Sequence, residues 1–292
     1  MAGDTARPGS EPRSVSSAFG SVREATQVQG YRSRLGSGAS SSEAVGPGKK
    51  GSGASSYSAW VAETHALSVL LRDAVAGRFP PADGTVQVLP SPPGRSDAVV
   101  SFTAHNVIAA DLDQGEILQR LPSQDPGEPM SAQFLAWLAG RLGTHAGMID
   151  LVMVAPAPDP AEDLPDLVSR DDLLDHPRLS RSRRYRSDLH CYSDREDRAL
   201  LVLGKGLADR WEMGIEVEPE FRGTGLGRLL VRAAVRIAPA GEPLFAQISP
   251  GNVASVRAFL AAGYKPICSE VVFLRRTRPE RAGRPQVTRI PK

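Results

Sequence analysis

The chain has 292 residues, a formal net charge of +2 at neutral pH and 41% hydrophobic residues. This length allows one large or two modest domains around a buried core, and so small a charge gives no argument for nucleic-acid binding. The chain contains neither the apolar stretch of a secretory signal nor a run long enough to span a bilayer, which predicts a protein that binds no membrane.

Cysteine and arginine usage adds two expectations. The only cysteines, Cys191 and Cys268, provide neither a disulfide framework nor zinc spacing; one bridge between them is left open, and a reducing cytoplasm is the simpler interpretation. Arginine far outnumbers lysine, a bias that resembles proteins from GC-rich bacterial genomes.

Both ends of the chain differ from its middle. Residues 1–57 are crowded with Ser, Gly and Ala and hold few large apolar residues, so we predict a disordered tail. Residues 277–292 form a basic tail, for which solvated chain is favoured over a nucleic-acid contact because no aromatic residues are interleaved with the arginines.

Residues 58–155 predict an α/β region of their own. Apolar spacing predicts helices at 59–76, 112–120 and 131–142, and strands at 98–104 and 148–154. The histidines of this region are too scattered to be metal ligands. The sequence leaves open whether the region is an added domain or a degenerate copy of the fold that follows it.

Residues 156–187 begin as a proline-rich acidic stretch and end as a basic one, which we interpret as a linker followed by a charged helix. Strands are predicted at 188–192 and 199–203, and another at 211–218, where Met213, Ile215 and Val217 alternate with glutamates. This alternation predicts a half-buried strand.

The segment Phe221–Arg228 joins that last strand to an amphipathic helix, 226–237, through three alternate glycines. Glycines allow close approach of backbone amides to an anion, and the positive end of a helix favours negative charge. The turn lacks the Gly-Lys-Ser/Thr of a nucleoside triphosphatase loop, and Arg228 stands where a dinucleotide fingerprint needs its third glycine. A pyrophosphate-binding turn is thus one interpretation, and a plain strand-to-helix turn is the other.

A second block, 252–264, follows a short strand at 244–248 and precedes a strand at 270–274. It predicts a helix that begins near Asn252 and ends at Gly263. Together, the order Arg-Gly-x-Gly-x-Gly after a strand and this Asn-x-x-Ser block, which ends in Gly-Tyr, resemble the GCN5-related N-acetyltransferase (GNAT) superfamily. The resemblance covers about 165–276 and is strongest over 211–276. It implies a mixed α/β sheet and a GNAT-like domain at 156–276.

The resemblance further implies acetyl-CoA as co-substrate and an amine as acceptor. It assigns the coenzyme to Ile215, Val217, Arg222, Gly223, Thr224, Gly225, Leu226, Gly227, Arg228, Asn252 and Ser255, with a backbone amide near Val217 as donor to the thioester oxygen. Glu212 and Glu216 share one face of their strand and are the candidate bases. Phe259 occupies the position, seven after Asn252, at which many members carry a proton-donating tyrosine.

Two functions follow: an N-acyltransferase, which we favour, and a non-catalytic acyl-CoA-binding or regulatory module on the same fold. DNA binding is a distant third. We expect a cytoplasmic monomer or homodimer without a metal. A run of aspartates is interpreted as hydrated surface in preference to a contact for a cationic acceptor: Asp163, Asp166, Asp171, Asp172 and Asp175.

Overall fold

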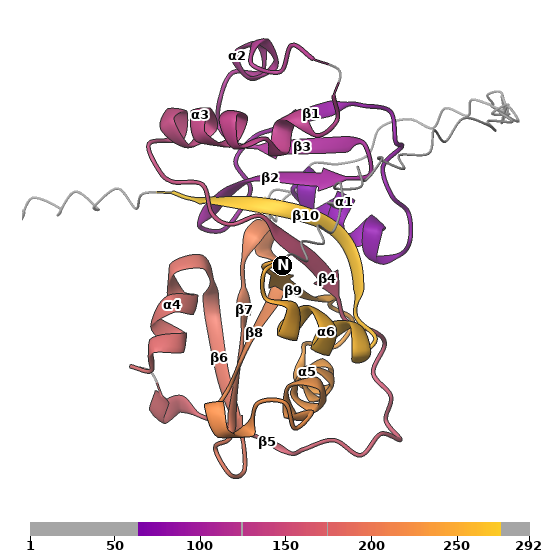
Figure 1. The fold of residues 1–292 in the computed structure, drawn as a ribbon, viewed down its shortest axis with the longest axis vertical. Helices are drawn as coiled ribbons and strands as arrows, with labels where there is room; N and C mark the ends of the chain where they lie inside the picture. The colour runs from indigo at the N-terminus through magenta and orange to yellow at the C-terminus, as the bar shows by residue number, and fades with distance from the viewer. Residues whose placement is uncertain (1–63, 124, 174, 276–292) are drawn as a thin grey trace, which may run out of the picture. The chain divides into compact units, whose positions relative to one another are not determined.

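The structure is a computed structural model that describes residues 64–123, 125–173 and 175–275. The predicted tails, 1–57 and 277–292, lie outside these residues. The described chain forms a ten-stranded mixed sheet in the order β1-β3-β2-β10-β4-β9-β8-β7-β6-β5, with helices packed against it (Figure 1). The predicted fold class, a mixed α/β sheet with a GNAT-like part, is confirmed.

The first part of the chain contributes α1 (Ala66–Val75), β1 (Val86–Leu89), β2 (Ser96–Phe102), β3 (His105–Ala109), α2 (Gln114–Gln119), α3 (Ala132–Leu142) and β4 (Asp150–Val154). The predicted helix at 59–76 begins too early, because His65 caps α1 by accepting a hydrogen bond from the Leu67 amide. The strand predicted at 98–104 is the first arm of a hairpin: β2 and β3 pair antiparallel around Ala104, whose φ is 50°.

The second part contributes β5 (Leu167–Ser169), α4 (Pro177–Tyr185), β6 (Ser187–Asp194), β7 (Ala199–Lys205), β8 (Trp211–Val217), α5 (Leu226–Ile237), β9 (Leu244–Ile248), α6 (Val253–Ala261) and β10 (Lys265–Leu274). The helix predicted at 226–237 and the strand predicted at 244–248 are confirmed with the same bounds. β10 is longer than predicted and includes a register shift between Pro266 and Cys268.

Strands from both parts alternate at the centre of the sheet. β10 pairs antiparallel with β2 on one side and with β4 on the other, and β4 then pairs antiparallel with β9. The sheet is therefore continuous across residues 155 and 156, and β4, from the first part, lies between two strands of the second part.

Two helical layers enclose β8. On one face Met213, Leu201 and Ala246 pack with Leu230 of α5 and Phe259 of α6. On the other face Val202 packs with Leu179 of α4. Because successive side chains of a strand point to opposite faces, Glu212 and Gly214 lie on the α4 face.

Burial of β8 differs from the sequence expectation at one site residue. Alternation predicted a half-buried strand with glutamates on its outer face, but Glu212 is 4% exposed. The physical reason is tertiary: α4 and two arginines cover that face. Cys191 and Cys268 are both free thiols and both buried, so no bridge joins them.

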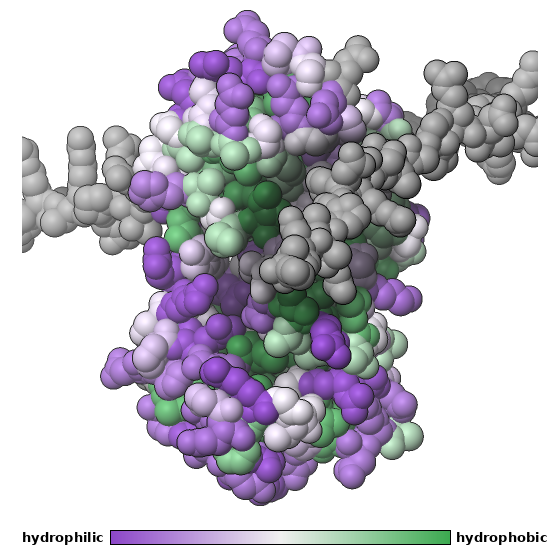
Figure 2. All heavy atoms as spheres, in the orientation of Figure 1, coloured by the Kyte–Doolittle hydropathy of each residue, from purple (hydrophilic) through white to green (hydrophobic). Residues whose placement is uncertain are grey.

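Hydrophilic side chains cover the two ends of the face shown in Figure 2, and apolar residues gather in its middle. Of the helices in the described part of the chain, none has the length and apolar character required to traverse a bilayer.

Candidate acyl-transfer site

The glycine turn between β8 and α5 presents a row of unused backbone amides. Gly223 and Gly225 have φ of 78° and 90°, and nothing lies within 4 Å of the Cβ position of either residue. Gly225 caps α5 without any side-chain hydrogen bond. None of the amides of residues 223–227 donates a hydrogen bond to another described residue. The turn therefore fits an anion at the helix N-terminus.

Side chains around the turn fix its shape from outside. The Thr224 hydroxyl donates to the Phe221 carbonyl oxygen at 2.7 Å, and Arg222 Nε donates to the Val217 carbonyl oxygen at 2.9 Å. Gly227 is packed more closely, since a Cβ there would meet Val217 Cγ2 at 3.6 Å. Arg228 is exposed on the first turn of α5, where its charge adds to the positive end of the helix.

β8 and β9 separate halfway along their length. They pair in parallel only at Trp211 with Leu244, Glu212 with Phe245 and Met213 with Ala246. Beyond this point β8 continues to pair with β7, and β9 pairs with β4. The edge of β8 from Gly214 to Val217 is thus without a strand partner on the β9 side, which leaves backbone groups for an extended ligand.

A cavity of about 340 Å³ opens where the two strands separate. Four of the site residues predicted from the sequence line it: Glu212, Ile215, Asn252 and Ser255. Asn252 also caps α6, because its Oδ1 accepts a hydrogen bond from the Ser255 amide at 3.2 Å. The other predicted coenzyme residues, Val217 and 222–228, lie beyond the cavity along the chain, at and after the end of β8.

The two candidate bases have different surroundings. Glu212 Oε2 pairs with Arg186 Nε at 2.8 Å, and Glu212 Oε1 pairs with Arg210 Nε at 2.9 Å. Burial would raise the pKa of Glu212, but the two guanidinium groups outweigh it and the net pKa is lowered. Glu216 is half-buried and forms no ion pair with a described residue. Glu212 is therefore held as an ion-paired carboxylate, whereas Glu216 has no ion pair with a described residue, lies near Arg178 and does not line the cavity.

The structure adds two carboxylates that the sequence analysis missed, Asp150 of β4 and Glu270 of β10. They are partners in the register of β4 and β10, so they share the α4 face of the sheet with Glu212, and both line the cavity. Burial raises the pKa of each. Glu270 pairs with Arg210 at 2.6 Å, whereas Asp150 forms no ion pair with a described residue. No local pattern marks these residues, because they are brought together by strand order alone.

The sequence analysis also missed the residues of α4 that form one wall of the cavity. Arg178, Arg181, Ser182 and Tyr185 all line the cavity. Arg181, Ser182 and Tyr185 follow Arg178 by three, four and seven positions, the spacing of one helical face, and this was the signal available in the sequence. The basic run was interpreted there only as a charged helix.

Phe259 also lines the cavity and is 3% exposed. Its ring meets that of Tyr264 edge-to-face, with centroids 4.9 Å apart. The Tyr264 hydroxyl is buried and donates to the Val231 carbonyl oxygen at 2.8 Å, and burial raises its pKa. Tyr264 is therefore no substitute proton donor, and Tyr185 is the phenol on the cavity wall among the described residues.

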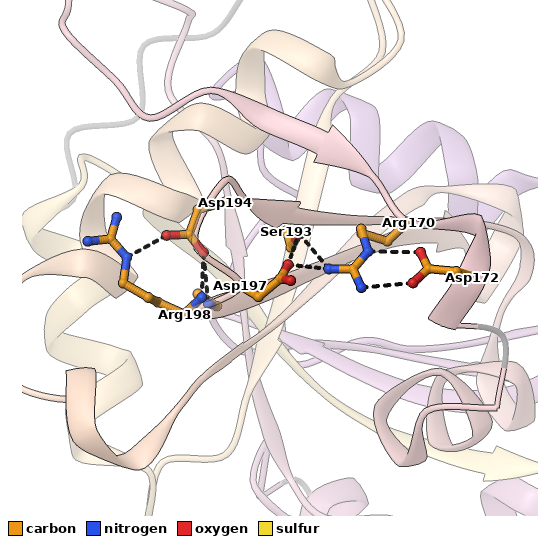
Figure 3. A network of polar contacts seen from close by, with 7 residues as sticks. Arg170, Asp172, Ser193, Asp194, Asp197 and Arg198 are labelled. Atoms are coloured by element: carbon orange, nitrogen blue, oxygen red, sulfur yellow. Dashed lines mark hydrogen bonds and ion pairs between the residues drawn. The ribbon is translucent and has the colours of Figure 1, made fainter.

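The run of aspartates between Asp163 and Asp175 does not line the cavity. Asp172 accepts two hydrogen bonds from Arg170, at 2.8 Å each, and Arg170 also contacts Asp197 (Figure 3). Asp166 pairs with Arg195 at 3.0 Å. These ion pairs tie β5 and the loop after it to the β6–β7 turn, which agrees with a role in the surface of the fold.

Residues 212–273 match the model of a GNAT-related family described as FR47-like protein. The match includes most of β8, the glycine turn and α6, the segments that carry the sequence resemblance. The C-terminal part of the chain is GNAT-like. A comparison with curated proteins gives no match.

Solved structures similar to the GNAT-like part include an acetyltransferase of the GNAT family from Colwellia psychrerythraea, with 16% identity, a TM-score of 0.34 and coverage of 50% of this chain and 63% of that one. Another is a GCN5-related N-acetyltransferase from Kribbella flavida, with 17% identity, a TM-score of 0.34 and coverage of 49% and 64%. The chain thus spans less than two thirds of these structures' length. Likeness at this level assigns no substrate.

Within the described part of the chain, no group of three or more His, Cys, Asp or Glu side chains is arranged to hold a metal ion.

Proposed function

We propose that the chain is an N-acyltransferase that moves an acetyl or other acyl group from coenzyme A to an amine. The observation that carries this proposal is the continuity of three features: the unused amides of the glycine turn, the separated strands β8 and β9, and the cavity between them. An elongated ligand with a pyrophosphate at one end and a thioester at the other matches this order.

The coenzyme residues are proposed as the sequence resemblance assigns them. The amides of 223–227 and the Arg228 guanidinium bind the pyrophosphate, and Arg222 and Thr224 hold the turn in shape. Ile215 and Val217 offer the free edge of β8 to the pantetheine, with Asn252 and Ser255 on the opposite side. Bound in this way, the coenzyme supplies the acyl group as an activated thioester.

The chemistry requires two proton movements. The acceptor nitrogen attacks the thioester carbonyl carbon, the carbon–sulfur bond breaks, the nitrogen loses a proton and the thiolate gains one. Because an alkyl ammonium has a pKa of about 10.4, a base is required before attack. We assign this task to Glu216, with Asp150 as the alternative, since both lack an ion-pair partner among the described residues. Glu212 is a positioning residue that orients Arg186.

The site has no obvious residue, among those that the structure describes, to protonate the departing thiolate. Phe259 has no proton to donate, so we assign this protonation to Tyr185 or to water. This observation favours the second candidate function, an acyl-CoA-binding module without turnover.

Calorimetric titration with acetyl-CoA, followed by a thiol-release assay over a panel of amines, tests the proposal. Binding with turnover is the expected result. Binding without turnover on any amine would support the regulatory module, and absence of binding would refute both functions. The two free cysteines, Cys191 and Cys268, fit our placement of the reaction in the cytoplasm.

A further inference from the structure

Two guanidinium groups on α4 face the proposed acyl-transfer cavity, Arg178 and Arg181, one helical turn apart. Arg178 stands directly over Gly214, at the point where β8 leaves β9: a Cβ at this position would collide with Arg178 Nη2. The glycine at 214 thus makes room for the arginine in the wall of the cavity.

Arg178 forms no ion pair with a described residue. Its Nε is buried and has no hydrogen bond in the described chain, and the carboxylate of Glu216 acts on it only from beyond ion-pair distance. Burial and the neighbouring positive charge of Arg186 lower the pKa of Arg178, and the negative charge of Glu216 offsets only part of this. A guanidinium stays charged even so, and a partly buried unpaired charge is costly.

Arg186, on the same side of the cavity, differs from Arg178 because its guanidinium group is engaged in hydrogen bonds and an ion pair. It pairs with Glu212 and donates to Gln247 Oε1 at 2.8 Å and to the Met213 carbonyl oxygen at 3.3 Å. Arg181 is exposed and, like Arg178, has no ion pair with a described residue. The cavity therefore holds two positive charges that an incoming anion can pair with.

The coenzyme phosphates are not that anion. They are assigned to the turn that follows β8, whereas Arg178 stands at Gly214. From Gly214 to Val217 alone the strand extends about 10 Å, at roughly 3.3 Å per residue. Arg178 thus lies toward the thioester end of the proposed coenzyme path, where the acceptor has to bind.

We infer that the acceptor amine carries a carboxylate and that Arg178, with Arg181, binds it. Guanidinium groups bind carboxylates with two parallel hydrogen bonds, and a cavity of about 340 Å³ suits a small molecule. Asp150, on the floor of the same cavity, offers a negative charge for the amino group. The site therefore fits a zwitterion, a free amino acid, while an acceptor with several positive charges meets repulsion from the α4 wall. This inference rests on the proposed function.

The test compares amino acids with matched amines that lack the carboxylate: glycine with glycinamide, L-phenylalanine with 2-phenylethylamine, and L-lysine with cadaverine. In the thiol-release assay we expect kcat/KM to be at least ten-fold higher for the amino acid of at least one pair. Arg178→Met should lower that kcat/KM by about ten- to a hundred-fold, chiefly through KM, because a charge-assisted pair is lost. Acetyl-CoA affinity should stay unchanged, kcat/KM with the matched amine should not fall, and Arg178→Lys should recover part of the loss.

Arg183→Met is the matched control, since Arg183 is an exposed residue of α4 that does not line the cavity. Equal or better turnover of the amines without a carboxylate overturns the inference while leaving the acyltransferase proposal standing. If no amine turns over, calorimetric titration of the three amino acids into the protein saturated with coenzyme A decides: binding that Arg178→Met abolishes supports the inference, and absence of binding refutes it. If the wild-type protein does not bind acetyl-CoA, the proposed function itself is refuted.

Discussion

Arg210 provides the sharpest test of the electrostatics beneath the cavity. It is 6% exposed and contacts two buried carboxylates, Glu212 at 2.9 Å and Glu270 at 2.6 Å. Arg210→Met removes this shared positive charge without opening a large void. Because this removal leaves Glu270 buried without a partner and Glu212 with Arg186 alone, we expect a loss of about 3–5 kcal/mol in the free energy of unfolding near neutral pH. This is a large part of the roughly 5–15 kcal/mol that stabilises a typical domain.

The sign of the pH dependence follows from the proton balance. In the wild-type protein the pKa of Glu212 lies below its ordinary value of 4.5, so its ion pairs stabilise the fold above that pH and are lost as pH falls through the lowered pKa. In Arg210→Met, loss of this guanidinium shifts the pKa of Glu212 upward and that of Glu270, which burial already raises in the wild-type protein, further upward. The folded variant then binds more protons than the unfolded one, and its stability falls as pH rises.

Urea unfolding followed by circular dichroism at about pH 5 and about pH 8 measures both effects. We expect the cost of Arg210→Met to be larger at the higher pH and to shrink at the lower one. A second substitution, Glu270→Gln, should recover part of the loss, because it removes the carboxylate that has no other ion-pair partner; Glu212 keeps Arg186. Arg183→Met, on the surface of α4, is the control and should change stability by less than about 0.5 kcal/mol. A cost below about 1 kcal/mol, or the same cost at both pH values, would refute the reasoning.

The remaining predictions concern the coenzyme turn and the chemical step. Gly225→Val should weaken acetyl-CoA binding at least ten-fold in calorimetry. The control is Gly241→Val, at a glycine of similar positive φ with open space around it, which should carry a similar strain and leave affinity intact. Equal affinity in both variants would show that the coenzyme binds elsewhere. Glu216→Gln should lower kcat and alter the rising limb of the pH–rate profile with coenzyme affinity unchanged, and if Asp150→Asn does so instead, the base is Asp150. Phe259→Leu should cost about 1 kcal/mol of stability and leave turnover within a few-fold, while faster turnover in Phe259→Tyr would show that proton donation limits the rate; a large loss of turnover in a stable Phe259→Leu protein would contradict a packing role.

Much of the second half of the fold was readable from the sequence because its signals are local. The glycine turn needs positive φ at Gly223 and Gly225, and the helix after it carries apolar residues at helical spacing from Leu226 to Ile237, so the helix was predicted. The helix capped by Asn252 was predicted for the same reason. In the first half, β1 and β3 were missed, because short runs between turns carry little periodicity.

Only the tertiary structure decided what surrounds the proposed reaction centre. A period of two shows which residues of β8 share a face, but it does not show whether another element covers that face. Here α4 covers it, so Glu212 is buried and ion-paired. Asp150 and Glu270 are neighbours because β4 and β10 pair, although 120 positions separate them along the chain. Strand order is set by packing of the whole sheet, and no local pattern contains it.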